Sequence, residues 1–101
     1  MGLLNRRASG PSQKIEKEVT IINRLGLHAR PAAMFVRIAS RYRSEVWVAK
    51  EGEQINGKSI MGLMMLAAGQ GSKLLLTAEG ADANESLTAL EKLVNQKFDE
   101  D

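Results

Sequence analysis

The spacing of apolar residues changes several times along the chain, and each change predicts a new element. Residues 18–22 carry β-branched side chains in alternation and predict a strand. Apolar residues 32, 35, 36, 39 and 42 then follow a helical period, which predicts a helix with one buried face. Residues 44–51, 54–56 and 73–79 predict three further strands. Residues 60–66 predict a short helix, and a final helix buries Leu87, Leu90, Leu93 and Val94.

The predicted order β-α-β-β-α-β-α indicates an α+β fold. Because the strands are few and alternating, we expect a four-stranded antiparallel sheet with three helices on one face and the other face open. Ser59 is expected to cap the second helix, and Asp82 the third, in capping-box spacing with Glu85. Strand parity predicts that Ile22, Trp47 and Leu75 face outward, and they form one apolar row across the open face if the last strand lies between the first and the second.

The bulk composition narrows the class of protein. Residues 1–14 are polar and contain Gly10-Pro11-Ser12, so we expect a flexible extension there and one domain over 15–101. Cysteine is absent and there is one histidine, which excludes thiolate metal sites and makes a structural zinc site unexpected. No apolar run has the length of a membrane span, so membrane insertion is not expected and the protein is expected in the cytoplasm.

Charge and aromatic content indicate a protein partner rather than nucleic acid. The formal net charge is only +2, and four aromatic residues leave few for stacking on bases. Between Val19 and Ser44 the chain carries five arginines and no acidic residue. A local basic face on a nearly neutral body favours docking to an acidic protein.

The segment 26–33, Gly-Leu-His-Ala-Arg-Pro-Ala-Ala, holds the candidate chemistry. Proline is tolerated in the first turn of a helix, so Pro31 places a helix start at about Ala29 with His28 at or just before the cap. The free N–H groups there and the guanidinium of Arg30 favour an anion, and together with the imidazole they predict a phosphoryl site. The alternative is an ordinary capping or solvent-exposed histidine.

This segment and a second one, Asn56-Gly57-Lys58-Ser59-Ile60-Met61-Gly62, resemble the histidine-containing phosphocarrier (HPr) family of the bacterial phosphoenolpyruvate-dependent sugar phosphotransferase system. The resemblance runs from about Lys17 to the end of the chain. It implies an open-faced β-sandwich and a carrier rather than an enzyme in its own right. In that family Nδ1 of the histidine, here His28, takes a phosphoryl group from Enzyme I and passes it to an Enzyme IIA domain, without a metal or other cofactor.

The resemblance also implies roles for further residues. Arg30 would balance the phosphoryl charge during transfer. Ser59 stands at the family's regulatory serine, the substrate of HPr kinase/phosphorylase where a host has that enzyme. A phosphate at Ser59 would act on an acidic partner that docks nearby.

A docking surface is expected from long apolar side chains that a two-turn helix cannot bury together. Methionine suits surfaces that adapt to several partners. The expected docking residues are Met34, Arg37, Ile60, Met61 and Met64; the alternative is a methionine cluster entirely within the core. Two other functions stay open: a carrier of the nitrogen-related branch, and a regulatory docking module that acts through Ser59 as a co-regulator of transcription.

Overall fold

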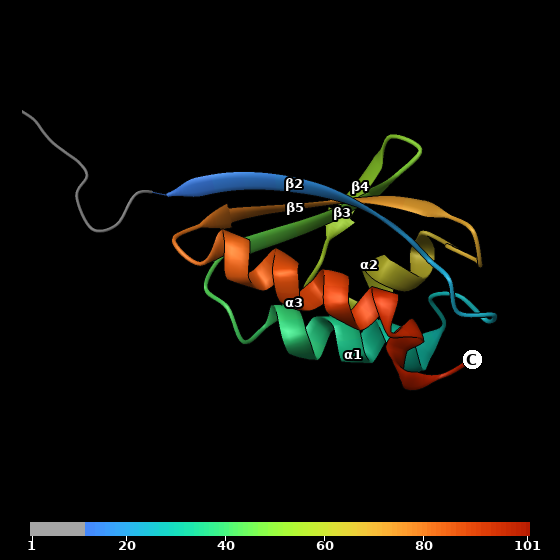
Figure 1. Cartoon of the computed structure of the whole chain (residues 1–101). Helices are drawn as coiled ribbons and strands as arrows, with labels where there is room; N and C mark the ends of the chain where they lie inside the picture. Colours follow the sequence, from blue (N-terminus) through green and yellow to red (C-terminus); the bar gives the residue numbers. More distant parts are fainter. Residues whose placement is uncertain (1–11) are drawn as a thin grey trace, which may run out of the picture.

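A four-stranded antiparallel sheet forms one layer of the protein, in the order β2-β5-β3-β4. The computed structural model describes residues 12–101 (Figure 1). Strand β5, the last along the chain, lies between the first two and pairs with both. The strands are β2 Gln13–Thr20, β3 Glu45–Lys50, β4 Glu53–Asn56 and β5 Lys73–Gly80.

Three helices cover one face of this sheet, and α1 and α3 lie side by side beneath it (Figure 1). The predicted α+β open-faced sandwich is therefore confirmed, including its element order. The helices are α1 Ala29–Ala39, α2 Ile60–Met65 and α3 Ala83–Asn95, and a short 3-10 turn, η1 Lys97–Asp99, follows α3.

The core lies between the sheet and the helices. Alternate residues of β5 point inward, so Leu74, Leu76 and Ala78 are buried as their spacing predicts. They pack with apolar side chains of the helices, and each fully buried leucine, valine or phenylalanine contributes about 1.5–3 kcal/mol. The largest fully buried apolar residues are Phe35, Phe98, Ile21, Leu63, Leu74, Leu76, Leu87 and Leu90.

Strand β2 begins earlier and ends earlier than the sequence predicts. Gln13 and Lys14, assigned to the flexible extension, pair with Gly80 and Glu79 of β5, while the strand ends at Thr20 rather than at residue 22. The alternation of apolar and polar residues is interrupted in β2 because Lys17 occupies an inward position. Its Nζ lies 3.1 Å from the carboxylate of Glu91 in α3. Residues 1–11 of the expected extension lie outside the described part of the chain.

The predicted apolar row on the open face is only partly present. Trp47 and Leu75 lie on that face on neighbouring strands. Ile22 comes after β2 has ended, and the residue that pairs with Leu75 on β2 is Glu18. The prediction was wrong for Ile22 because the strand boundary was misplaced.

Asp82 does not cap α3 with its side chain, although it stands at the N-cap. Its carboxylate instead accepts hydrogen bonds from the backbone N–H groups of Arg43 and Ser44, both at 2.9 Å, and from the Ser44 hydroxyl. These bonds, that from the Ser44 hydroxyl first, lower the pKa of Asp82. The capping-box prediction fails because the loop after α1 offers three donors at the same place.

Candidate functional site

The loop from β2 to α1 fixes the position of the candidate histidine. Gly26 has φ +71°, where a side chain is strained, and an added Cβ would overlap the Ala68 carbonyl oxygen and lie 2.8 Å from Gly69 Cα. The next residue, Leu27, is buried and donates its N–H to Ala68 O at 2.9 Å. The loop is thereby anchored to the segment after α2, immediately before His28.

Helix α1 begins at Ala29 with His28 at the N-cap, as Pro31 predicts. The imidazole makes no capping hydrogen bond to the helix, and the first turn contains no acidic residue. The first N–H groups of a helix have no intrahelical partner, and Pro31 has no N–H to contribute. The positive end of α1 therefore faces the imidazole and favours an anion bound there.

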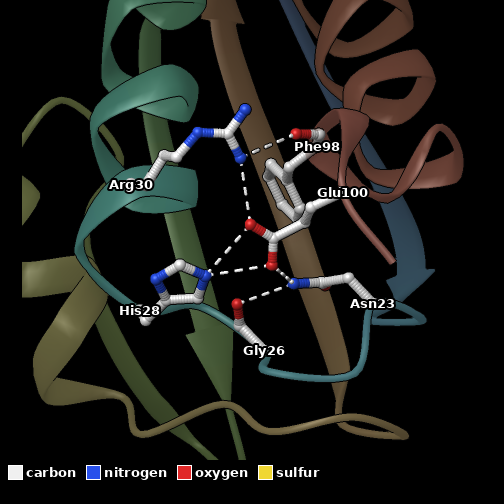
Figure 2. A network of polar contacts seen from close by, with 6 residues as sticks. All are labelled: Asn23, Gly26, His28, Arg30, Phe98 and Glu100. Carbon is white, nitrogen blue, oxygen red and sulfur yellow. Dashed lines mark hydrogen bonds and ion pairs between the residues drawn. The ribbon is translucent and has the colours of Figure 1, made fainter.

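The carboxylate of Glu100 joins the histidine to the arginine (Figure 2). Its Oε2 lies 2.9 Å from His28 Nε2 and accepts from Asn23 Nδ2 at 2.9 Å. Its Oε1 lies 3.1 Å from His28 Nε2 and accepts from Arg30 Nη1 at 3.0 Å. The side chain of Glu100 is 17% exposed, that of His28 37% and that of Arg30 54%, so the cluster is open to solvent on the arginine side.

A turn of unusual backbone conformation brings Glu100 to this place. Lys97, Phe98 and Asp99 have φ of 58°, 53° and 59°, in the left-handed region that costs a residue with a side chain roughly 1–2 kcal/mol. Phe98 is fully buried and anchors the turn. The chain end is held as well, since Arg24 donates its backbone N–H to Asp101 O at 2.7 Å.

The surrounding donors stabilise the ionised form of Glu100. Hydrogen bonds from His28 and then Asn23, with the charges of His28 and Arg30, lower its pKa below its ordinary value. Asn23 is fully buried and also donates to Gly26 O at 2.8 Å. The Asn23 amide nitrogen therefore donates to both Gly26 O and Glu100 Oε2. Its Oδ1 has no hydrogen-bond partner among the described residues.

Ser59 caps α2 as predicted. Its Oγ accepts the N–H of Gly62 at 3.0 Å. The turn that leads from β4 to Ser59 requires a glycine at position 57, because an added Cβ there would lie 2.6 Å from Val46 Cγ1. Helix α2 packs beside α1, so the N-cap serine and the candidate histidine belong to neighbouring elements (Figure 1).

The expected docking residues divide into exposed and partly buried ones. Ile60, Met61 and Met64 are 43%, 74% and 44% exposed, which excludes a methionine cluster entirely within the core. Arg37 is exposed, whereas Met34 is half-buried and packs against the core. Two exposed apolar residues were missed: Met65 in α2, and Leu25 in the loop before His28, at 69% and 63%.

A shallow hollow of about 170 Å³ lies beside the histidine. It is lined by Leu25, Leu27, His28, Ala67, Ala68 and Gly69. Ala67, one of the lining residues, has a positive φ of 51°.

Residues 12–101 contain no group of three or more histidine, cysteine, aspartate or glutamate residues that could hold a metal ion. Within the same range, none of the helices combines the length and the apolar character that crossing a membrane requires.

Residues 15–96 match the protein family described as "PTS HPr component phosphorylation site". That match spans most of the chain and includes both His28 and Ser59. The chain belongs to the HPr family. The resemblance stated from the two sequence segments is thereby confirmed.

Individual HPr proteins agree with this assignment over nearly their whole length. The phosphocarrier protein HPr of Pseudomonas aeruginosa is 55% identical over 84 residues, which are 82% of this chain and 93% of that protein. The crystal structure of HPr-C-His from Thermoanaerobacter tengcongensis has a TM-score of 0.83 at 47% identity and covers 86% of this chain and 98% of its own. A third relative, the HPr-like protein Crh of Halalkalibacterium halodurans, is 50% identical over 76 residues, 75% of this chain and 90% of that protein.

The sequence does not predict that Asn23 and Glu100 lie at this candidate site. Asn23 lies in a loop without periodicity, and Glu100 lies between two other acidic residues, Asp99 and Asp101. The one available signal was Phe98, an aromatic residue in an otherwise polar segment. A buried aromatic side chain near a terminus indicates that the end of the chain is docked on the domain.

Proposed function

We propose that this HPr-family chain is the phosphocarrier of a phosphoenolpyruvate-dependent sugar phosphotransferase system. His28 accepts a phosphoryl group from phospho-Enzyme I and passes it to Enzyme IIA domains. The observation that carries the proposal is the placement of His28 at the N-terminus of α1, with Arg30 next to it on the same first turn. A helix N-terminus and a guanidinium both stabilise a phosphoryl group.

Arg30 is the residue that we assign to the phosphoryl charge during transfer. Its guanidinium is half exposed, so it can reach a group that a partner brings to His28. Positive groups fixed near the transferring phosphoryl stabilise the transition state more than the separate reactants. The reaction we propose uses no metal or other cofactor.

The partner surface is proposed to surround His28 on the side of α2. Exposed apolar residues there are Leu25 in the loop and Ile60, Met61, Met64 and Met65 in α2. Arg37 of α1 adds a positive charge for an acidic partner. We place the carrier in the cytoplasm, where the relay from Enzyme I to Enzyme IIA domains would take place.

Incubation with phosphoenolpyruvate and Enzyme I tests this function. We expect the intact mass to rise by one phosphoryl group, and the group to be lost on acid treatment, because phosphohistidine is acid-labile. The matched control is His28→Gln, which keeps a polar side chain at the N-cap but has no ring nitrogen. No mass increase in the wild type, or an equal increase in the variant, would contradict the proposal.

A second function is proposed for Ser59, supported by the match to the HPr-like protein Crh. Ser59 is the N-cap of α2, and a phosphate at a helix start is favoured by the helix dipole. HPr kinase/phosphorylase would add it, and its charge would repel acidic partners from α2. Incubation with ATP and that kinase should give an acid-stable adduct that Ser59→Ala lacks. Phosphorylation of Ser59 would also fit the two alternative functions of the chain, a regulatory docking module and a carrier of the nitrogen-related branch.

A further inference from the structure

The open face of the sheet, on the side away from the helices, has an apolar centre (Figure 1). Trp47 and Leu75 lie there on neighbouring strands, Trp47 half-buried and Leu75 38% exposed. Both line a hollow of about 200 Å³. Most of the rest of its lining is charged: Lys14, Glu16 and Glu79. A hollow with an apolar floor and a charged rim fits a segment that carries both kinds of side chain.

The charges on this face are mostly negative. In the register of the sheet, residues of the same parity as Trp47 and Leu75 point to the open face. Among the described residues these include four exposed glutamates and two exposed lysines: Glu16, Glu18, Glu45 and Glu79, with Lys14 and Lys73. The face therefore favours a positively charged occupant and disfavours anionic lipid headgroups and nucleic acid.

A second copy of the chain does not have the chemistry that this face requires. A symmetric dimer would place the same patch of both copies against itself, so the glutamates of one copy would face those of the other. Like charges at close distance repel one another. The occupant has to be basic as well as apolar.

The chain itself carries such a segment in residues 1–11, immediately before the described part. It contains Leu3-Leu4 and Arg6-Arg7 and has no acidic residue. Gly10-Pro11 is a dipeptide typical of turns and stands just before β2 begins at Gln13. A reversal of the chain at this dipeptide would direct the preceding residues back along the sheet.

The spacing within this segment matches the spacing on the open face. On β5, Glu79 at the charged end and Leu75 at the apolar centre are four residues apart, which is about 13 Å along the strand. In the segment, Arg7 and Leu3 are also four residues apart. The order agrees as well, because Arg7 is nearer to the turn and Glu79 is nearer to the start of β2. An extended segment that runs back from the turn would bring the arginine to the glutamate and the leucine to the apolar centre.

We propose that residues 1–11 fold back over the open face of the sheet, with the two leucines on the apolar centre and the two arginines beside the glutamates. The contact is intramolecular, so the covalent link to β2 keeps the segment at a high effective concentration. Exposed ion pairs contribute little, so the leucines supply most of the stabilisation. The contact lies on the side of the sheet away from the helices and leaves the proposed partner surface free (Figure 1).

A cysteine introduced into this cysteine-free chain tests the contact through a nitroxide spin label. The label is placed on Asn5→Cys in the full chain, between the leucines and the arginines. We expect the indole N–H signal of Trp47 and the amide signal of Leu75 to lose most of their intensity, because a nitroxide broadens the signals of nearby protons. The amide signal of Arg37, in α1, should keep its intensity.

The matched control carries the same label together with Leu3→Ser and Leu4→Ser. The tether to β2 then keeps its length while the apolar contact is lost, so the two open-face signals should recover. Arg6→Gln with Arg7→Gln should give a smaller recovery, because the leucines remain.

Each other result has a defined meaning. Full intensity of the open-face signals in the labelled chain overturns the proposal. An equal loss in the leucine variant overturns it too, because the tether alone would then explain the broadening. A loss seen only when spin-labelled and 15N-labelled copies are mixed assigns the face to a second copy, which contradicts the intramolecular contact. None of these measurements involves His28 or phosphoryl transfer, so the result does not depend on the proposed function.

Discussion

Two helices of this protein begin with a polar residue next to the proposed partner surface, α1 at His28 and α2 at Ser59. The Ser59 hydroxyl is bound within its own helix, to the N–H of Gly62. The His28 ring makes no bond to its helix and is held instead by Glu100, 72 residues further along the chain. The Ser59 site is completed within its own helix, and the His28 site needs the folded domain.

This difference separates the two modifications that we propose. A phosphate on Ser59 would replace a cap by a stronger ligand of the same N–H groups, so the fold should accept it and the effect should fall on partners. A phosphoryl group on His28 would leave the helix bonds untouched and would compete with Glu100 for Arg30. Because the P–N bond of phosphohistidine is labile and the ester bond of phosphoserine is not, we expect modification at Ser59 to be stable and modification at His28 to be transferable.

The largest effect is expected from removing the imidazole. His28→Ala should abolish phosphoenolpyruvate-dependent labelling while circular dichroism and the unfolding midpoint stay close to those of the wild type, because the ring is partly exposed and caps nothing. Ser59→Ala should still be labelled at His28. Normal labelling of His28→Ala would exclude this residue as the acceptor.

Removing the anchor of the C-terminal turn should disturb the α1 site and leave the α2 site intact. Phe98 is fully buried, so Phe98→Ala should cost about 3–5 kcal/mol of unfolding free energy. Leu76→Ala, in the sheet strand β5 rather than in α1, is the matched control, with a cost of about 2–5 kcal/mol. At a temperature where both variants are folded, only Phe98→Ala should slow phosphoryl transfer. Equal rates in the two would show that the turn does not act on the site.

The parts of the site that lie within one segment could be predicted from the sequence. Pro31 fixes the start of α1 through its missing N–H, and this alone places His28 at the cap. Ser59 before an apolar turn predicts its own capping bond. In both cases the decisive interaction joins residues a few positions apart, where periodicity and capping rules apply.

The features that could not be predicted from the sequence depend on contacts between distant segments of the chain. Glu100 reaches His28 through three consecutive left-handed residues without a glycine, a conformation that no turn rule predicts. Asp82 has the sequence of a helix cap, but donors from the loop after α1 compete for its carboxylate. The start of β2 was missed because Lys17 occupies an inward position and is neutralised by Glu91.

Arg30→Ala should reduce transfer without unfolding the protein. We expect kcat with phospho-Enzyme I to fall roughly 100-fold, the cost of removing one donor from a developing negative charge, and KM to change much less. Arg37→Ala, a second exposed arginine on α1, is the matched control and should change mainly KM. A rise in KM alone for Arg30→Ala would make Arg30 a docking residue.

Substitutions at Ser59 should separate its capping role from its charge. Ser59→Ala loses the bond to Gly62 and should cost about 1 kcal/mol, measured by denaturant unfolding. Ser59→Asp keeps a capping oxygen, so its stability should be close to that of the wild type, but its charge beside Met61 should slow transfer from Enzyme I. If Ser59→Asp transfers as fast as the wild type, charge at this position does not regulate docking.

The smallest effect is expected in the pH dependence of stability, and it involves the α1 site but not the α2 site. The pKa of Glu100 lies below its ordinary value because His28, Asn23 and Arg30 stabilise the ionised form, and the pKa of Asp82 is lowered by Ser44 and Arg43. A carboxyl group with a lowered folded-state pKa stabilises the fold above its ordinary pKa, and the contribution is lost as the pH falls through the lowered value. Denaturant unfolding between neutral and acidic pH should therefore show a smaller loss on acidification for Glu100→Gln and for Asp82→Asn than for the wild type. Ser59→Ala should follow the wild-type slope, because that site contains no titrating group; equal slopes for the wild type and Glu100→Gln would show that the bonds to Glu100 do not stabilise the fold.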